Sequence, residues 1–460
     1  MSPRLSFIVV AVSALVAVAV ALLPAPDGVP PQALAALALT LFTVSMWATG
    51  ALPAHTAALL FFLIASVFAI APARVVFAGF QSSAWWLVFS GLVIGAAADA
   101  SGLGQWVARH AFRHAGMSYA GLIAAILTGA VVLCFIIPSS VGRMAIAIPA
   151  VAAIAAEAGH AEGSRARDGT LIAVVFGSFI LAFGIMPANL INILTTGTAE
   201  TLLGVHITYG EYMLMQFPVN TVLKGLIMGG LVIWMFRPEG ESRPVRPAGP
   251  EALGHDGRVL LVIVLLTLAA WTTDFLHGIQ AGWVALAAAL LCLIPGIGAV
   301  TAKMFSQRVE VTTLLFAASV LGIGPVLHES GASALIGRVI ASHLPLSEMG
   351  PAGSYFAMAY AASLTSIVAN ITGAVAIVTP LATQFATAGL DVKTAALAQI
   401  NGLSAPFFPY EALPLMVGLA MAGVAPSRVM KFCIAMALAG MLVLTPLNYL
   451  WWRALGYIPG

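Results

Sequence analysis

Uninterrupted apolar runs of about 20 residues recur along the whole chain, and they limit what it can fold into more than any other feature. A run of that length spans the hydrocarbon core of a bilayer as a helix, because a helix satisfies its own backbone hydrogen bonds. Only 8% of the 460 residues are charged, whereas soluble domains carry about 25%. The sequence therefore predicts an all-α polytopic membrane protein that has the lipid bilayer as its partner.

The apolar runs predict about eleven transmembrane helices. The first is expected to be a retained span rather than a signal peptide, because no clear cleavage site precedes a soluble domain. The expected spans are 5–23, 31–50, 53–71, 83–100, 170–204, 212–236, 257–277, 280–297, 312–328, 394–424 and 426–452.

Two further apolar blocks, 119–158 and 352–388, are about twice the length of a single span and are interrupted near their midpoints. A re-entrant hairpin, which enters and leaves the membrane on the same side, fits that pattern. Non-helical backbone survives at membrane depth only where protein or a wet cavity surrounds it. We therefore predict two hairpins whose tips lie inside the protein.

The distribution of Lys and Arg supports this topology, because cytoplasmic loops of membrane proteins are enriched in both. With a cytoplasmic N-terminus and no net crossing by either hairpin, the other side holds only Arg74, Arg338, Lys393 and Arg453. Reading either block as one full span would spoil this asymmetry. The cytoplasmic set is Arg4, Arg109, Arg113, Arg165, Arg167, Arg237, Arg243, Arg246, Arg258, Lys303, Arg308, Arg428 and Lys431.

The chain also resembles itself, since 85–109 aligns with 314–338 and 137–149 aligns with 368–380. By the charge distribution the two copies have opposite topology, which is typical of secondary transporters with a site near mid-membrane. We expect an N-terminal helix (1–30), a first inverted repeat (31–236), a Pro- and Gly-rich cytoplasmic linker (237–256) and a second inverted repeat (257–455).

Four places interrupt the helical pattern at membrane depth. Two are the hairpin tips, PSSVGR (138–143) and ANITG (369–373), and two lie inside long spans, at GIMPANLI (184–191) and APFFPYEALP (405–414). Proline and glycine stop the backbone ladder there, which frees carbonyls to bind cations and helix N-termini to bind anions. Matched interruptions in two repeats indicate an ion and substrate site.

This order of spans, hairpin and broken helix resembles the divalent anion/sodium symporter (DASS) family of the ion transporter superfamily, over most of 30–455. WLVFSGLVIGAAADASGLG is similar to that family's span before the first hairpin, and MPANLI to its Pro-Pro-Asn stretch. The tip before AIAIP is similar to its Ser-Asn-Thr signature. The resemblance implies transport of dicarboxylates, citrate or sulfate, usually with sodium, by an elevator movement against a scaffold that forms a homodimer.

In that family the two tips and the two broken helices form the sodium and substrate sites. The resemblance therefore implies substrate- and ion-binding roles for Ser139, Ser140, Gly142, Arg143, Pro187, Ala188, Asn189, Asn370, Thr372, Gly373, Pro409 and Glu411, with possible sodium near Ser139, Ser140, Asn370 and Thr372.

The signature positions depart from the family pattern. The first tip reads Ser139-Ser140-Val141, the second reads Asn370-Ile371-Thr372, and the second broken helix has Pro409-Tyr410-Glu411 in place of a Pro-Pro-Asn-like turn. These departures put the sodium sites in doubt and leave exchange or proton coupling open.

Arg143 has no counterpart in the second copy, where Ala374 stands in its place. An ionisable side chain at bilayer depth is costly, so it usually faces a cavity or a partner. We hypothesise that Arg143 is a fixed countercharge for an anionic substrate, or that it occupies the electrostatic place of sodium. The alternative is a structural arginine that pairs within the hairpin or reaches the headgroups.

Two other ionisable residues lie inside apolar segments. Glu411 could bind a cation, carry a coupling proton, pair with Arg143 in the empty site, or only cap backbone amides. For Lys224 we expect a structural role, either extended to the membrane interface or paired.

The sequence thus predicts a secondary transporter of a small anion in a membrane, expected to be the bacterial cytoplasmic membrane. A cation/proton antiporter or metalloid exporter of the same superfamily is the alternative, with Glu411 as the coupling acid. No HExxH, GxSxG or His/Cys/acid cluster points to an enzyme. We expect no nucleic-acid partner, no certain metal site and no cofactor beyond a coupling Na⁺ or H⁺.

Overall fold

The computed structural model describes residues 3–26, 28–112, 118–238, 252–343, 346–386 and 389–459, and within them the chain forms helices and no strands. Short 3₁₀ and π helices are labelled η. The elements are α1 (Pro3–Ala21), α2 (Pro31–Thr49), α3 (Ala54–Val67), α4 (Ala73–Val76), η1 (Ala78–Gln81), α5 (Ser83–Ser101), α6 (Leu103–Phe112), α7 (Tyr119–Ile136), α8 (Ser140–Glu157), α9 (Arg165–Ile180), η2 (Leu181–Gly184), η3 (Met186–Ala188), α10 (Leu190–Leu203), α11 (Tyr209–Phe217), η4 (Pro218–Leu223), α12 (Lys224–Met235), α13 (His255–Thr272), α14 (Asp274–His277), α15 (Ala281–Leu293), α16 (Ala302–Arg308), α17 (Val311–Glu329), α18 (Ala332–His343), α19 (Leu346–Val378), η5 (Thr379–Leu381), α20 (Ala382–Ala386), α21 (Val392–Leu403), η6 (Pro409–Glu411), α22 (Leu413–Ala422), α23 (Pro426–Ala439), η7 (Gly440–Leu444) and α24 (Thr445–Ala454).

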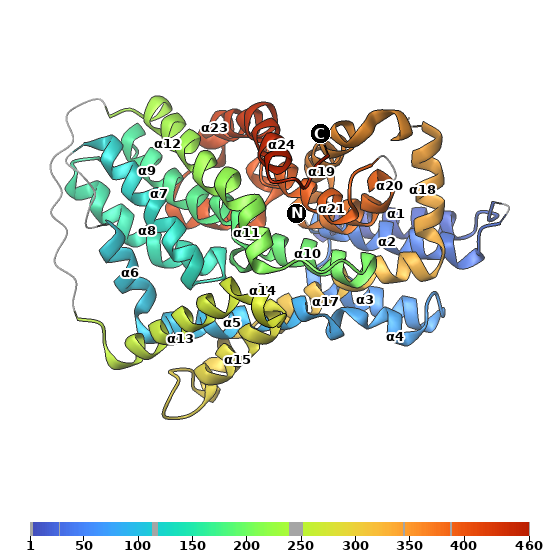
Figure 1. The fold of residues 1–460 in the computed structure, drawn as a ribbon, viewed down its shortest axis with the longest axis horizontal. Helices are drawn as coiled ribbons and strands as arrows, with labels where there is room; N and C mark the ends of the chain where they lie inside the picture. The colour runs from blue at the N-terminus through green and yellow to red at the C-terminus, as the bar shows by residue number, and fades with distance from the viewer. Residues whose placement is uncertain are drawn as a thin grey trace.

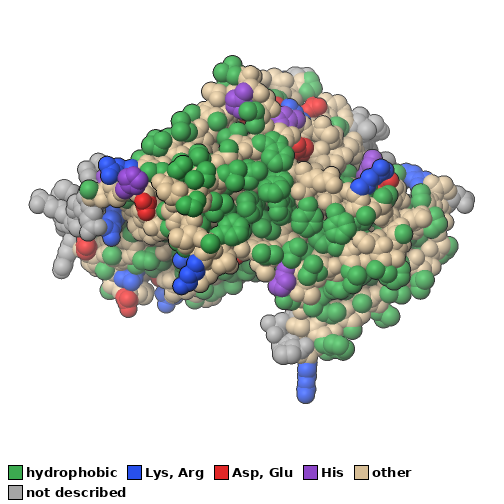
Figure 2. All heavy atoms as spheres, turned by 90° about the horizontal axis from the view of Figure 1, so that it is seen from below, with side chains coloured by type: hydrophobic (Ala, Val, Ile, Leu, Met, Phe, Trp, Pro, Cys, Tyr) green, Lys and Arg blue, Asp and Glu red, His purple; other side chains and the backbone are tan. Residues whose placement is uncertain are grey.

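In the described part of the chain, 11 helical segments are long and apolar enough to cross a membrane. This confirms the predicted class of polytopic α-helical membrane protein. The set differs in detail from the predicted spans, because it includes α7, α8 and the segment Met349–Ala386, whereas α3, α15 and α22 are shorter. The face in Figure 2 is covered mainly by hydrophobic and uncharged side chains, as expected of a surface in contact with lipid.

The first predicted hairpin consists of α7 and α8, joined by Ile137–Ser139. Both helices pack against α9, and the three lie together at one end of the molecule (Figure 1). Pro138 explains the interruption, because proline has no N–H to donate and disfavours helical backbone in the residue before it. Ser139 then starts α8, since its hydroxyl accepts a hydrogen bond from the Gly142 N–H at 3.1 Å.

The second predicted hairpin region contains α19, η5 and α20. Its interruption lies at Asn370, where φ is +54°, a backbone conformation that residues other than glycine seldom adopt. Asparagine is among the residues that tolerate positive φ best, and here its Oδ1 also accepts from the Gly373 N–H at 2.9 Å. The break therefore falls inside the predicted tip, 369–373, with helix on both sides.

Both long interrupted spans are broken helices. The first runs through α9, then η2 and η3, and resumes as α10; the second runs through α21 and η6 and resumes as α22. Each first half-helix is tied by an ion pair to the span that follows the other broken helix. Asp168 of α9 meets Arg428 of α23 at 2.8 Å, and Lys393 of α21 meets Glu211 of α11 at 3.0 Å.

The packing brings the two halves of the chain together around these broken helices. Helix α22 packs on α8, the second helix of the first predicted hairpin, and α10 packs on α19 and η5 of the second predicted hairpin region. Helices α6, α16 and α18 were not predicted as separate elements because their apolar residues form no long run; α6, for example, is a short amphipathic helix. The predicted domain boundaries stay predictions, and 239–251 of the linker lie outside the described residues.

Candidate functional site

Arg143 is the centre of the first cluster of predicted site residues. It lies in the first turn of α8, and its side chain is 0% exposed. Its Nη2 donates to the Ser178 carbonyl at 2.6 Å, to the Ala188 carbonyl at 2.9 Å and to the Ser140 hydroxyl at 3.0 Å. Its Nε donates to the same Ser178 carbonyl at 3.2 Å, and its Nη1 donates to the Ile137 carbonyl.

The acceptors come from three interrupted pieces of backbone. The Ile137 carbonyl belongs to the hairpin tip, the Ser178 carbonyl to the last turn of α9, and the Ala188 carbonyl to the end of η3 before α10. Carbonyls freed by unwound backbone and by half-helix C-termini are the groups that coordinate Na⁺ in transporters with broken helices. In this protein the Arg143 guanidinium lies among these carbonyl oxygens and donates hydrogen bonds to them.

Two helix N-termini meet beside this guanidinium. Ser139 is the N-cap of α8, and Asn189 is the N-cap of α10, where its Oδ1 accepts from the Ile191 N–H at 3.1 Å. A helix N-terminus carries a partial positive charge and unpaired N–H groups. These two N-termini and the Arg143 guanidinium are the positively charged groups of the first break.

Several polar atoms of the first break have no hydrogen-bond partner within the described structure, although they are buried. They include the Asn189 Nδ2, the Asn192 Oδ1 and the Ser178 hydroxyl. An unpaired buried polar group is costly, so such groups commonly have a water or a ligand as partner. Asn189 is a predicted site residue whose buried amide nitrogen has an unused donor in the described structure.

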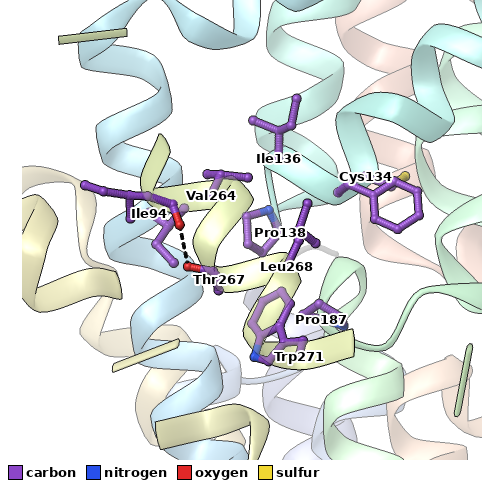
Figure 3. Close-up of a pocket in the computed structure, with 11 residues that line it drawn as sticks. Ile94, Cys134, Ile136, Pro138, Pro187, Val264, Thr267, Leu268 and Trp271 are labelled. Carbon is purple, nitrogen blue, oxygen red and sulfur yellow. Dashed lines mark hydrogen bonds between the residues drawn. The ribbon is translucent and has the colours of Figure 1, made fainter. Parts of the chain in front are cut away.

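A small hollow lies against the first tip and the first break (Figure 3). Pro138 of the tip and Pro187 of η3 line it on one side. Thr267 and Trp271 of α13 face them, and Ile94 of α5 closes another side. Apart from Thr267 and the prolines the walls are hydrophobic, so the polar groups for an ionic ligand come from the break itself.

The second cluster joins the second hairpin region to the second break. Glu411, at the end of η6, is 1% exposed, and its carboxylate accepts from the Ser366 hydroxyl at 2.7 Å and from the Phe408 N–H at 2.9 Å. Asn370 donates from Nδ2 to the Trp47 carbonyl of α2 at 3.0 Å. Pro409 is buried in η6, Gly373 is buried beside Asn370, and Thr372 is half-buried.

Pairing of Glu411 with Arg143, one of the roles left open for Glu411, does not occur in this structure. The Glu411 carboxylate is bound by Ser366 and Phe408, while Arg143 is bound by carbonyls and by Ser140. The reason is that each charged group has its hydrogen-bond partners within its own break. Among the described residues Glu411 behaves as the expected cap of backbone amides.

Lys224 was predicted to reach the membrane interface or to pair. It is instead 1% exposed, and its ammonium donates to Asn220 and Ser404, so it does not extend to the headgroups.

Sequence reasoning missed Ser178, Ser366 and Ser404, which supply acceptors or donors to Arg143, Glu411 and Lys224. Ser178 takes part through its carbonyl, a role that no residue type signals, whereas Ser404 accepts from Lys224 through both its carbonyl and its hydroxyl. Ser366 lies three residues before the second tip, and its position alone did not distinguish it from other small residues.

No group of three or more His, Cys, Asp or Glu side chains able to hold a metal occurs among the residues the structure describes. The oxygen sets at the two breaks consist of carbonyls, hydroxyls, amides and the Glu411 carboxylate, which are hard donors, unlike the thiolates and imidazoles that suit transition metals.

Comparisons with known proteins place the chain in a family of membrane proteins. Residues 5–458 match the family model described as sodium:sulfate symporter transmembrane region. A membrane protein of Cupriavidus necator is 24% identical over 354 residues, which are 71% of this chain and 68% of that protein.

Among solved structures, the YdaH transporter of Alcanivorax borkumensis, described as having an unusual topology, is similar with a TM-score of 0.55. The likeness covers 84% of this chain and 88% of that one at 14% identity, so it speaks for the fold alone.

Proposed function

The chain belongs to the sodium:sulfate symporter family, and on that premise we propose that it is a secondary transporter of a small dianion or citrate that works without sodium. Its substrate class is a dicarboxylate, citrate or sulfate, bound at the first break. Movement is of the elevator type, in a homodimer in the bacterial cytoplasmic membrane with a cytoplasmic N-terminus. The integral membrane location itself follows from the family and from the apolar helices.

The observation that carries the proposal is the burial of Arg143 among carbonyl oxygens, with no carboxylate bonded to it in the described structure. Of its N–H donors, those on Nε and Nη2 are taken up by backbone and by Ser140. Arg143 therefore acts through its field, and the substrate's direct donors are the N-termini of α8 and α10 and the Asn189 amide.

A permanent charge in this place changes the coupling. A transporter that binds sodium between the same carbonyls gains its positive charge only when the ion is present. Arg143 keeps that charge through the whole cycle, so the site attracts anions in the absence of sodium. Exchange of one anion for another then needs no cation, and net transport is driven by a proton or by an anion gradient.

Reconstitution into liposomes tests the proposal. Vesicles loaded with one unlabelled anion are diluted into the labelled anion, with dicarboxylates, citrate and sulfate tested in turn. Choline, sodium and proton gradients are compared, and protein-free liposomes are the control. We expect exchange of at least one anion in choline at the rate seen in sodium. Failure of every anion under each gradient would favour the cation/proton antiporter.

Replacing Glu411 by Gln is expected to leave exchange and its pH profile close to wild type, with a loss of about tenfold at most, since one hydrogen bond to a charged group changes. The Glu411 carboxylate accepts from the Phe408 N–H and from the Ser366 hydroxyl. In the glutamine variant the amide oxygen can still accept from the Phe408 N–H, and the Ser366 hydroxyl can rotate to keep a hydrogen bond with the amide. Uptake is measured across a range of pH values in the same liposomes.

The matched control for that variant is Ser366→Ala, which removes one donor to Glu411 and keeps the carboxylate. A flat pH profile in Glu411→Gln beside a pH-dependent wild type would contradict the capping role and assign proton carriage to this residue.

A further inference from the structure

A buried cation also contacts the end of the first half of the second broken helix. The Lys224 side chain, from the first turn of α12, is 1% exposed. Its ammonium donates to the Ser404 carbonyl at 3.3 Å, to the Asn220 Oδ1 at 2.8 Å and to the Ser404 hydroxyl. No ion pair with a carboxylate is formed by Lys224 among the described residues. The charge is thus held by neutral oxygens alone.

The place of this ammonium matches the place of the Arg143 guanidinium. Ser404 caps the C-terminus of α21, the first half of the second broken helix. Arg143 binds the Ser178 carbonyl in the last turn of α9, the first half of the first broken helix. A helix C-terminus carries a partial negative charge, and here each of the two ends inside the protein and receives one cationic side chain. The two cations come from different elements and do not correspond in the internal repeat.

The chain holds Lys224 in position through a turn that contacts both half-helix ends. Lys224 directly follows the π-helical turn η4, and π turns frequently occur at functional sites. Within η4 the Thr221 hydroxyl donates to the Leu181 carbonyl at 2.7 Å, just after α9. The Asn220 amide nitrogen donates to Gln216 at 2.7 Å and to Asn401 of α21 at 2.9 Å, which turns its oxygen toward Lys224.

We propose that Lys224 is a tethered cation at the second break, meaning a side-chain charge that takes the place of a co-transported sodium ion at the C-terminus of α21. The proposal rests on the proposed function and extends it to the other half of the chain. An ammonium has three N–H donors and meets three oxygen acceptors here, two from Ser404 and one from Asn220. A carbonyl, a hydroxyl and an amide oxygen are also ligands that suit Na⁺.

A purely structural lysine would serve only as a hydrogen-bond donor, and four variants separate the two roles. Lys224→Ala removes the charge and opens space for an ion, whereas Lys224→Met removes the charge and fills the space. Lys224→Gln keeps a neutral donor, and Lys224→Arg keeps the charge. Lys393→Ala, which removes a lysine paired with Glu211 away from the break, is the matched control.

Two measurements are made on each purified protein. The first is the melting temperature in sodium chloride and in choline chloride at equal ionic strength, which needs no anion substrate. The second is anion exchange in liposomes in the same two salts. We expect sodium to raise the melting temperature of Lys224→Ala specifically, and not that of the wild type, Lys224→Met or Lys393→Ala.

In choline, we expect the rate of anion exchange by Lys224→Ala, Lys224→Met and Lys224→Gln to be about tenfold or more below that of the wild type. The reason is that a buried charge-assisted contact is lost. Sodium should restore Lys224→Ala and leave Lys224→Met slow, and Lys224→Arg should retain exchange in both salts. Two results would overturn the proposal. One is anion exchange by Lys224→Gln in choline at the wild-type rate, and the other is the absence of any sodium-specific rise in the melting temperature of folded Lys224→Ala.

These outcomes are distinguishable from a failure of the proposed function. If the wild type exchanges no anion while sodium still stabilises Lys224→Ala, the tethered cation stands and the substrate class falls. If the wild type exchanges anions without sodium and Lys224→Ala is indifferent to sodium, the substrate class stands and the tethered cation falls. If Lys224→Ala does not fold, the rate of anion exchange by Lys224→Gln in choline still decides the proposal.

Discussion

Replacing Arg143 by alanine is expected to abolish anion exchange in choline chloride, with a loss of at least about 100-fold, and sodium should restore part of it. The change removes every donor from the carbonyls of Ile137, Ser178 and Ala188. Each buried acceptor left unsatisfied costs about 1–3 kcal/mol, and about 1.4 kcal/mol corresponds to a factor of ten. The vacated oxygens form a set that a sodium ion can occupy.

Three further variants sharpen this prediction in the same liposome assay. Arg143→Met fills the space without a charge, so sodium should not restore it. Arg143→Lys keeps a charge but has no fork of N–H groups, so it should lose exchange in part. Arg74→Ala removes an exposed cation and should have no effect. Near-normal exchange by Arg143→Ala and Arg143→Lys in choline would refute the role of this charge.

Replacing Gly402 by alanine is expected to prevent the protein from folding or to lower its melting temperature severely. Gly402 lies in the last turn of α21, before the second break, where α21 packs on α19. A Cβ there would lie 1.9 Å from the Ala359 carbonyl oxygen and 2.9 Å from the Ser363 nitrogen. Both are backbone atoms, which cannot rotate away, so the cost lies at or above the upper end of the about 1–3 kcal/mol typical of overpacking.

The matched control for Gly402→Ala is Gly95→Ala in α5, where a Cβ meets no atom within 4 Å. Alanine is about 1 kcal/mol more favourable than glycine in a helix interior, so this variant should be as stable as wild type or slightly more so. Melting temperature and the monodisperse fraction after purification report both variants. An unchanged melting temperature for Gly402→Ala would contradict the close approach of α21 and α19.

The course of the backbone was largely predictable from the sequence, because its signals are local. Pro138 and Ser139 end one helix and begin the next through their own backbone and hydroxyl, and Asn370 marks the other tip in the same way. Apolar length predicted most spans. It failed for α3 and α15, which are shorter than the runs that contain them, because glycine, proline and tight turns end these helices early.

The partners of the buried charges were not predictable in the same way. The acceptors of Arg143 include carbonyls 35 and 45 residues away in the chain, and those of Lys224 include Ser404, 180 residues away. Every residue type carries a carbonyl, so nothing in the sequence distinguishes Ser178 or Ala188 as a ligand. Pairing of Glu411 with Arg143 was one of several roles that the sequence left open, because opposite charge in a sequence says nothing about which nearer donors satisfy each group.

The sequence by itself determined that the chain is a membrane protein with four interruptions at membrane depth and one charge, Arg143, that its internal repeat does not copy. These properties depend on hydropathy, proline, glycine and capping side chains, which act over a few residues. Only the tertiary structure decided that the side chains of Arg143 and Lys224 each donate a hydrogen bond to a carbonyl at the C-terminal end of a half-helix. Such contacts depend on how helices far apart in the chain pack, because burial forces each charge to take whichever oxygens that packing brings within reach.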